Sequence, residues 1–178
     1  MPEKHKGNVM MSLLKIFVVI SVVLAIALLV AGQAGMLRGA VPTDLGLRNG
    51  QLKPPANNPN SVSSQASLHA SHPFRAYADI APLGYTGDGA AALAEFARAV
   101  AIVKAMPGTT VVDEKPGYVY AQCQTRWLKF TDDLELALDE SARVIHVRSA
   151  SRLGKSDLGV NRKRVEAIRA AMAGDSPQ

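Results

Sequence analysis

The segment from Arg148 to Glu166 is dense in residue types that bind anions. It leaves a predicted strand, crosses a loop of glycine and serine, and enters a predicted helix. Free amides at a helix N-terminus, hydroxyls and guanidinium groups are the donors from which anion sites are built. We therefore predict binding of an anionic group here, together with an earlier polar block; the predicted set is Arg148, Ser149, Ser151, Arg152, Asn161, Arg162, Arg164, Ser63, Ser64 and Gln65.

A structural role is the alternative for the same cations. The arginines could pair with acidic residues of the chain, and the glycines could merely shape the connection. A binding site needs guanidinium groups that face a solvent-reached pocket, whereas a structural network buries and pairs them. The acidic members of such a network are predicted to be Asp132, Asp133, Glu135 and Asp157.

Hydrolysis is a further alternative, since Ser64, His146 and Glu135 could act as nucleophile, base and orienting acid. No nucleophile-elbow motif surrounds Ser64, so we predict no catalytic residues. The feature that decides is whether these three side chains converge in one pocket.

Metal ions and other cofactors are not predicted. Strand alternation sends Asp132 to the opposite face from Asp133 and Glu135. His69 and His72 are three residues apart, which would place them together on a helical turn, but the surrounding residues show no helical pattern.

A resemblance to a known family rests on three blocks: Asn60–Gln65 with Ile80–Leu83, Phe130–Glu135, and Arg148–Glu166 with Arg169. On these blocks the chain resembles the bacterial family called domain of unknown function 1499, over about residues 57–170. Many members are similar to envelope proteins with a membrane segment or lipoprotein signal, so the resemblance implies an envelope location and no particular reaction. Members commonly carry Cys where this chain has Ser61, which argues against an essential thiol there.

Length and charge exclude other classes of protein. The 178 residues allow one ordinary domain with extensions. The net charge of +5 is uneven, with +6 over residues 143–169 and −4 over residues 113–140. Only 5% of residues are aromatic, too few for base stacking. We predict no nucleic-acid partner, and expect a membrane together with an anionic ligand, a lipid or an envelope protein.

Leu13–Ala31 is a run of 19 residues that are nearly all apolar. As a helix it spans about 28 Å, close to a hydrocarbon core. Three lysines precede or begin the run, which predicts a cytoplasmic tail over residues 1–12 and a periplasmic domain on a bacterial inner membrane. A cleaved signal peptide ending near Gly32-Gln33-Ala34 is the competing interpretation. Both place residues 35–178 outside the cytoplasm.

Residues 32–56 are rich in Gly, Pro and Asn and are predicted to be a flexible linker before a domain over residues 57–178. The domain is predicted to be α+β, with a four-stranded antiparallel sheet and two packing helices in the order α-β-β-β-β-α. The helices are expected at residues 89–105, capped by Asp88, and 159–173, capped by Ser156 or Asp157. The strands are expected at residues 109–113, 118–124, 127–138 and 144–150.

The last two strands alternate clearly enough to predict a register. Pairing Leu136 with Ile145 and Leu134 with Val147 buries both apolar sets on one face. The other face then pairs Glu135 with His146 and Asp133 with Arg148, placing opposite charges side by side.

Overall fold

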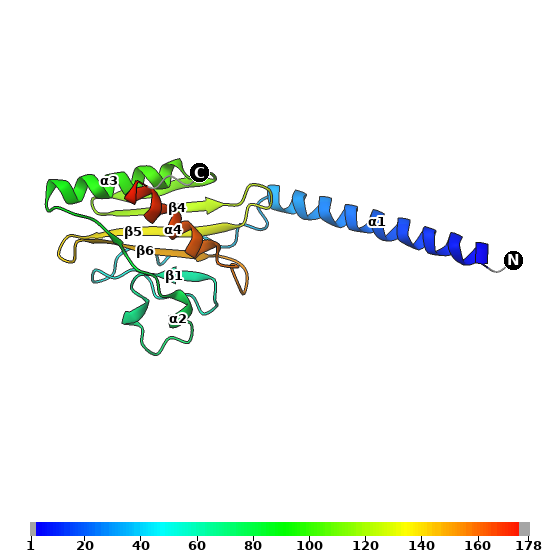
Figure 1. Cartoon of the computed structure of the whole chain (residues 1–178), viewed down its shortest axis with the longest axis horizontal. Coiled ribbons are helices and arrows are strands. Elements are labelled where there is room, and N and C mark those ends of the chain that lie inside the picture. The colour runs from blue at the N-terminus through cyan, green and yellow to red at the C-terminus, as the bar shows by residue number, and fades with distance from the viewer. Residues whose placement is uncertain (1–2, 175–178) are drawn as a thin grey trace.

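The computed structural model describes residues 3–174 and shows a long helix projecting from an α+β domain (Figure 1). The first two residues of the predicted cytoplasmic tail and the last four of the predicted domain lie outside the described residues. Helix α1 spans Glu3–Gln33, and its stretch Val9–Gln33 is long and apolar enough to cross a membrane. A signal sequence at this position has the same properties.

The domain is built on a six-stranded antiparallel sheet in the order β1-β6-β5-β4-β3, with β2 also paired to β6. The prediction of four strands is therefore wrong. It missed the two strands of three and two residues, which are too short to show an alternating pattern. The strands are β1 (Ser61–Ser63), β2 (Leu83–Gly84), β3 (Thr109–Lys115), β4 (Tyr118–Gln124), β5 (Thr131–Asp139) and β6 (Val144–Ser151).

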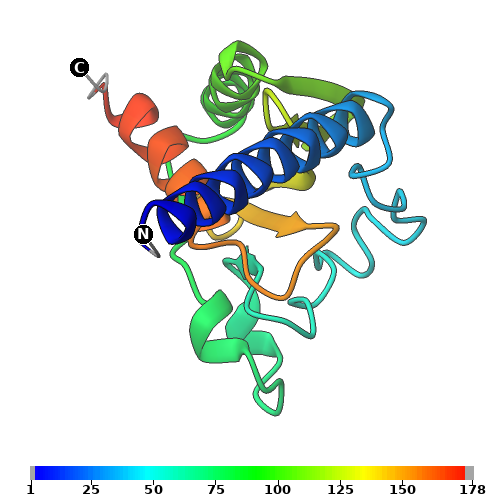
Figure 2. The same ribbon diagram turned by 90° about the vertical axis from the view of Figure 1, so that its right-hand side faces the viewer.

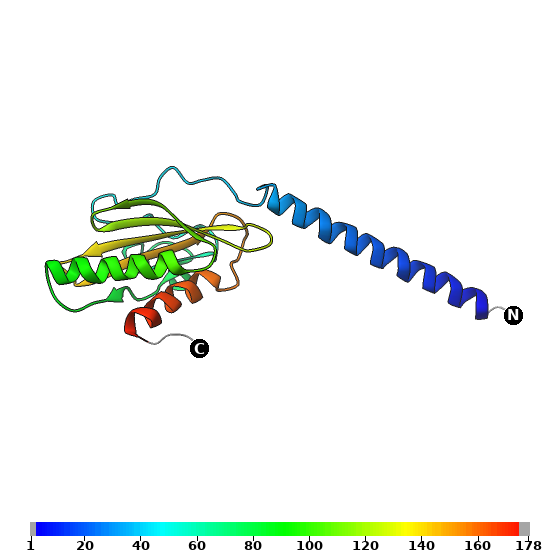
Figure 3. The ribbon, with the colours of Figure 1, turned by 90° about the horizontal axis from the view of Figure 1, so that it is seen from above.

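Two helices, α3 (Ala90–Ala105) and α4 (Val160–Ala173), cover one face of the sheet (Figure 3). Phe96 and Val100 of α3 and Ile168 of α4 pack on Leu134 and Val147 of the sheet in the main hydrophobic core. Two helices packed on one face of the sheet are what the apolar patterns of residues 89–105 and 159–173 predict. A short 3-10 helix (Ala66–Leu68) and the four-residue helix α2 (Arg75–Ala78), both unpredicted, follow β1.

The opposite face of the sheet is covered by part of the segment that the sequence predicts to be a flexible linker. Leu52 is 2% exposed and packs with Leu45 against Tyr118, Tyr120 and Ala137. These contacts hold the chain that follows α1 across the sheet, on the side away from α3 and α4 (Figure 3). The sheet therefore has two covered faces and two separate apolar clusters.

The predicted register between β5 and β6 is wrong by two residues. Leu136 faces Val147 and Glu135 faces Arg148, because β5 continues to Asp139 before the turn. A shift of two preserves which side chains share a face, so the assignment of faces is unaffected. The carboxylate of Asp139 holds this turn by accepting hydrogen bonds from Ser141 and Ala142.

The predicted helix caps have different outcomes. Asp88 does not cap α3, because its carboxylate binds Arg143 at 2.8 and 3.0 Å. Asp157 does satisfy free amides at the start of α4, accepting from Gly159 at 3.1 Å and from Asn161 at 3.0 Å.

Candidate functional site

Arg148 lies within the covered second face of the sheet. Its guanidinium is 3.4 Å from Oε2 of Glu135, and its Nε donates to the carbonyl of Pro54. The other oxygen of Glu135 accepts hydrogen bonds from the Tyr118 hydroxyl and the Gly46 amide, each at 2.8 Å. Burial lowers the pKa of Arg148, and burial next to Glu135 raises that of Tyr118.

Arg152 forms a second pair on the same face, with Asp133. Its Nε and Nη2 bind both carboxylate oxygens at 2.7–3.1 Å, and their side chains are only 4% and 2% exposed. The Tyr120 hydroxyl accepts from Arg152 at 2.9 Å and donates to Asp133 at 2.6 Å. The hydrogen bond to Asp133 raises the pKa of Arg152, so the cation is retained in this closed setting.

Arg164 belongs to a separate network on the helix-covered face. It reaches from α4 to Asp132 at 2.6 Å and to Ser149 and Asn161 at 2.9 and 2.6 Å. The amide of Asn161 donates to Ser151 at 3.0 Å. Asp132 thus lies across the sheet from Asp133, as the alternation predicts.

Arg162 and Asp157 connect α4 to the chain after β1. Arg162 donates to the carbonyls of Tyr77 and Asp79 at 2.7 and 2.8 Å. Asp157 accepts a hydrogen bond from the Tyr77 hydroxyl. Burial opposes ionisation of Asp157, but this bond and two backbone amides lower its pKa below the ordinary value. Burial and the same bond raise the pKa of Tyr77 to about 12.

The block Ser63–Gln65 packs directly against the cationic segment. Ser63 pairs with Arg148 in the ladder between β1 and β6, and Gln65 accepts a hydrogen bond from the Leu52 amide at 2.7 Å. The structure therefore gathers the predicted binding residues around β6. It also gives each of the arginines in that set a partner inside the protein, as the structural alternative requires.

Ser64 and His146 meet at the end of β1. The Ser64 hydroxyl oxygen lies 3.1 Å from Nδ1 of His146, and Nε2 of His146 lies 3.5 Å from Asp139. Glu135, the acid expected in this group, has other partners, as described for Arg148. The Ser64 oxygen also accepts a hydrogen bond from the Val147 amide at 2.9 Å, so the hydroxyl helps to hold the chain after β1 against β6.

A cavity of about 410 Å³ lies between the chain at Asp44–Asn57 and the turn that carries His69 and His72. The turn closes through a hydrogen bond from the His72 amide to the His69 carbonyl at 2.9 Å, and both histidines line the cavity. Arg48 and Lys53 also line it. Lys53 binds Asp44 at 2.6 Å, which lowers the pKa of that carboxyl.

The two imidazoles have unpaired nitrogens. Nε2 of His69 and Nε2 of His72 are buried and have no hydrogen-bond partner among the described residues. Nδ1 of His72 accepts the Phe74 amide at 3.2 Å, so a neutral His72 ring carries its proton on Nε2. The sequence signal for this pair is the spacing of three residues between the histidines. Among the side chains that the structure describes, acidic, histidine and cysteine residues form no cluster of three able to hold a metal.

A sequence model of the family described as protein of unknown function (DUF1499) matches residues 51–172. The chain belongs to this family. No curated protein and no solved structure matches the chain. The DUF1499 match takes in the charge networks around β6 as well as His69 and His72, whereas α1, Asp44 and Arg48 precede it. It begins at Gln51, beside the buried Leu52, within the segment predicted to be a linker.

Proposed function

We propose that this DUF1499 chain is a non-catalytic binding module, anchored in the bacterial inner membrane by α1 with its domain in the periplasm. The exposed apolar surface of α1 supports the anchor, since a bilayer is the solvent that such a helix requires. Basic residues on its N-terminal side support the orientation.

We further propose that the ligand is an anionic group held in the cavity beside His69 and His72. The buried network around Arg148 and Arg152 then serves the fold, because those guanidinium groups already have carboxylate partners. The observation that carries the proposal is the pair of unpaired imidazole nitrogens beside a cavity that Arg48 also lines. A buried donor such as Nε2 of a neutral His72 costs about 1–3 kcal/mol without an acceptor, and an anion's oxygen would recover this cost.

The test is a titration of the full chain in detergent micelles with inorganic phosphate, followed by NMR of the histidine rings. We expect the signals of His69 and His72 to shift and those of His146 to stay. Arg48→Met should weaken phosphate binding by about tenfold, or about 1.4 kcal/mol. Arg98→Met removes the same charge from the surface of α3 and should leave binding unchanged. Equal weakening by both variants, or unshifted rings, contradicts a site in this cavity.

A hydrolase is the second candidate, favoured by the contacts among Ser64, His146 and Asp139. A serine activated in this way should react with a fluorophosphonate probe and lose that reaction in Ser64→Ala. Our proposal expects no labelling, because the Ser64 oxygen is bound to the Val147 amide. Labelling of Ser64 by the probe would favour the hydrolase over the binding module.

A further inference from the structure

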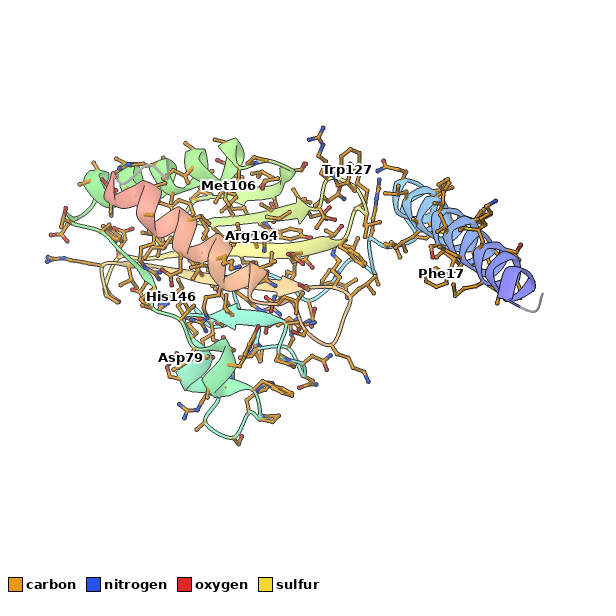
Figure 4. The ribbon with its side chains drawn as sticks, turned by 45° about the vertical axis from the view of Figure 1, so that its right-hand side comes forward. Phe17, Asp79, Met106, Trp127, His146 and Arg164 are labelled. Atoms are coloured by element: carbon orange, nitrogen blue, oxygen red, sulfur yellow. The ribbon has the colours of Figure 1, made fainter. Side chains whose placement is uncertain are left out.

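Two loops lie at the end of the domain from which α1 emerges. One joins β4 to β5 over residues 125–130, and the other joins β6 to α4 over residues 152–159. Figure 2 looks onto this end with α1 toward the viewer, and Figure 4 places Trp127 beside the domain end of α1. Both loops therefore lie at the level at which α1 ends.

The contact between α1 and the first loop is close. Gln33 donates to the carbonyl of Trp127 at 2.7 Å. A Cβ on Gly32 would come within 2.7–2.9 Å of the backbone of Leu128, so only glycine fits there. A Cβ on Gly39 would likewise lie 2.7 Å from Arg152, at the start of the second loop. The end of α1 is therefore packed directly against the domain, with no flexible linker between them.

These loops expose large apolar side chains. Trp127 is 62% exposed and Leu158 is 86% exposed. Leu158 also has a φ of 52°, a conformation that costs a leucine about 1 kcal/mol or more. Further apolar side chains of the second loop and its surroundings line a cavity of about 280 Å³; they include Phe130, Leu153 and Val160.

Basic side chains border this apolar surface. Arg38, Arg126 and Lys155 are exposed, and none is in an ion pair with an acidic residue of the described part of the chain. The guanidinium of Arg126 lies 4.8 Å from the centre of the Trp127 ring. Tryptophan with neighbouring cations is typical of the boundary between a bilayer and water. Each such cation near an anionic membrane adds about 1 kcal/mol of attraction.

We infer that the loop surface formed by residues 125–130 and 153–160 rests on the anionic bilayer that holds α1, with Trp127 and Leu158 among the lipid headgroups. This inference rests on the proposed function, because it requires α1 to be in the membrane. The bilayer is the occupant that the geometry selects, since α1 ends against the first loop and the surrounding charges complement anionic lipid. A second copy of the chain is an alternative occupant that the test separates.

Trp127 is the only tryptophan of the chain and reports on this surface directly. The full chain is reconstituted into vesicles of phosphatidylglycerol and phosphatidylcholine, with and without bromine on the acyl chains. We expect brominated lipid to quench Trp127 by more than half. In a Trp127→Phe background, Leu158→Trp should also be quenched, although Leu158 lies on the other loop.

Ala142→Trp in the same background is the matched control. Ala142 is exposed in the turn at the far end of β5, about 26 Å from the first loop at 3.3 Å per residue. Its emission should be unaffected by brominated lipid. Replacing Arg38, Arg126 and Lys155 by Gln should reduce quenching at position 158, whereas replacing Arg98, Lys104 and Lys115 by Gln should not.

The outcomes distinguish the inference from the function on which it rests. If the chain does not float with the vesicles, the proposed anchor fails. If it floats but the tryptophans at 127 and 158 are unquenched, the anchor stands and the docked surface is overturned. Unquenched tryptophans together with crosslinks between chains at residue 158 would assign the surface to a second copy. Equal quenching at 142 also overturns docking through these loops.

Discussion

Arg152 gives a buried carboxylate its cationic partner. Replacing Arg152 by Met leaves Asp133 charged and enclosed, which typically costs about 3–5 kcal/mol of unfolding free energy. Urea unfolding of the full chain in micelles measures the loss. The control Arg98→Met removes a half-exposed arginine and should change stability by less than about 0.5 kcal/mol. Adding Asp133→Asn to Arg152→Met should restore part of the loss; no difference between the two arginine variants contradicts a structural role.

Asp157 makes stability depend on acid. Its pKa is lower in the folded chain than in the unfolded chain, so the contribution is present above the unfolded value of about 3.9 and is lost as pH falls through the folded value. We expect the melting temperature of the wild-type chain to fall more steeply below pH 4 than that of Asp157→Asn. Scanning calorimetry at a series of pH values measures both slopes; parallel slopes contradict the assignment.

The predictable part of the site was the set of residues and their faces. Alternation alone separates Asp132 from Asp133 and places Asp133, Glu135 and Arg148 on one face. It could not choose between registers two residues apart, because both bury the same leucines. Nor could it show that Tyr118 and Tyr120 complete the pairs, since a tyrosine in a strand reads as an apolar residue.

At the scale of elements, the segment before β1 should depend on a single leucine. Leu52→Ala removes a side chain that is 2% exposed and should cost about 2–5 kcal/mol. Leu47→Ala makes the same change at a side chain that is 43% exposed, and should cost much less. Hydrogen exchange followed by mass spectrometry should show faster exchange over residues 44–56 in Leu52→Ala only. Unchanged exchange there would mean that the segment is held by other contacts.

Helices and strands long enough to contain several apolar repeats are predictable from the sequence, and the shorter ones are not. Helices α3 and α4 and strands β3 to β6 each carry enough apolar repeats to be recognised. The chain from Asp44 to Ala78 has no such repeat. It is held in place by single contacts instead, such as the hydrogen bond from the Leu52 amide to Gln65. The histidine-lined cavity lies in that part of the chain, which is why the sequence did not predict it.

At the scale of the whole molecule, Gly32 sets how closely α1 is joined to the domain. Gly32→Val forces a side chain into the backbone of Leu128 and should separate the helix from the first loop. Ala34→Val also introduces a valine, but at an exposed position, and serves as control. We expect the fluorescence anisotropy of Trp127 in vesicles to drop in Gly32→Val alone. Equal anisotropy in both variants contradicts a rigid junction.

The long-range contacts of the domain determine when each part of it can fold during synthesis of the chain. Gly46 binds Glu135, 89 residues later, and the carbonyl of Asn60 binds Asn161, 101 residues later. Contacts so distant in sequence form slowly and only once both ends are present. As synthesis proceeds from the N-terminus, the first part of the domain has to wait, unfolded, for the last strand and helix to be made. A nascent chain that stops before Tyr118 therefore exposes Leu52 and β1 without partners, and quality-control proteases should recognise such a fragment while sparing the complete protein.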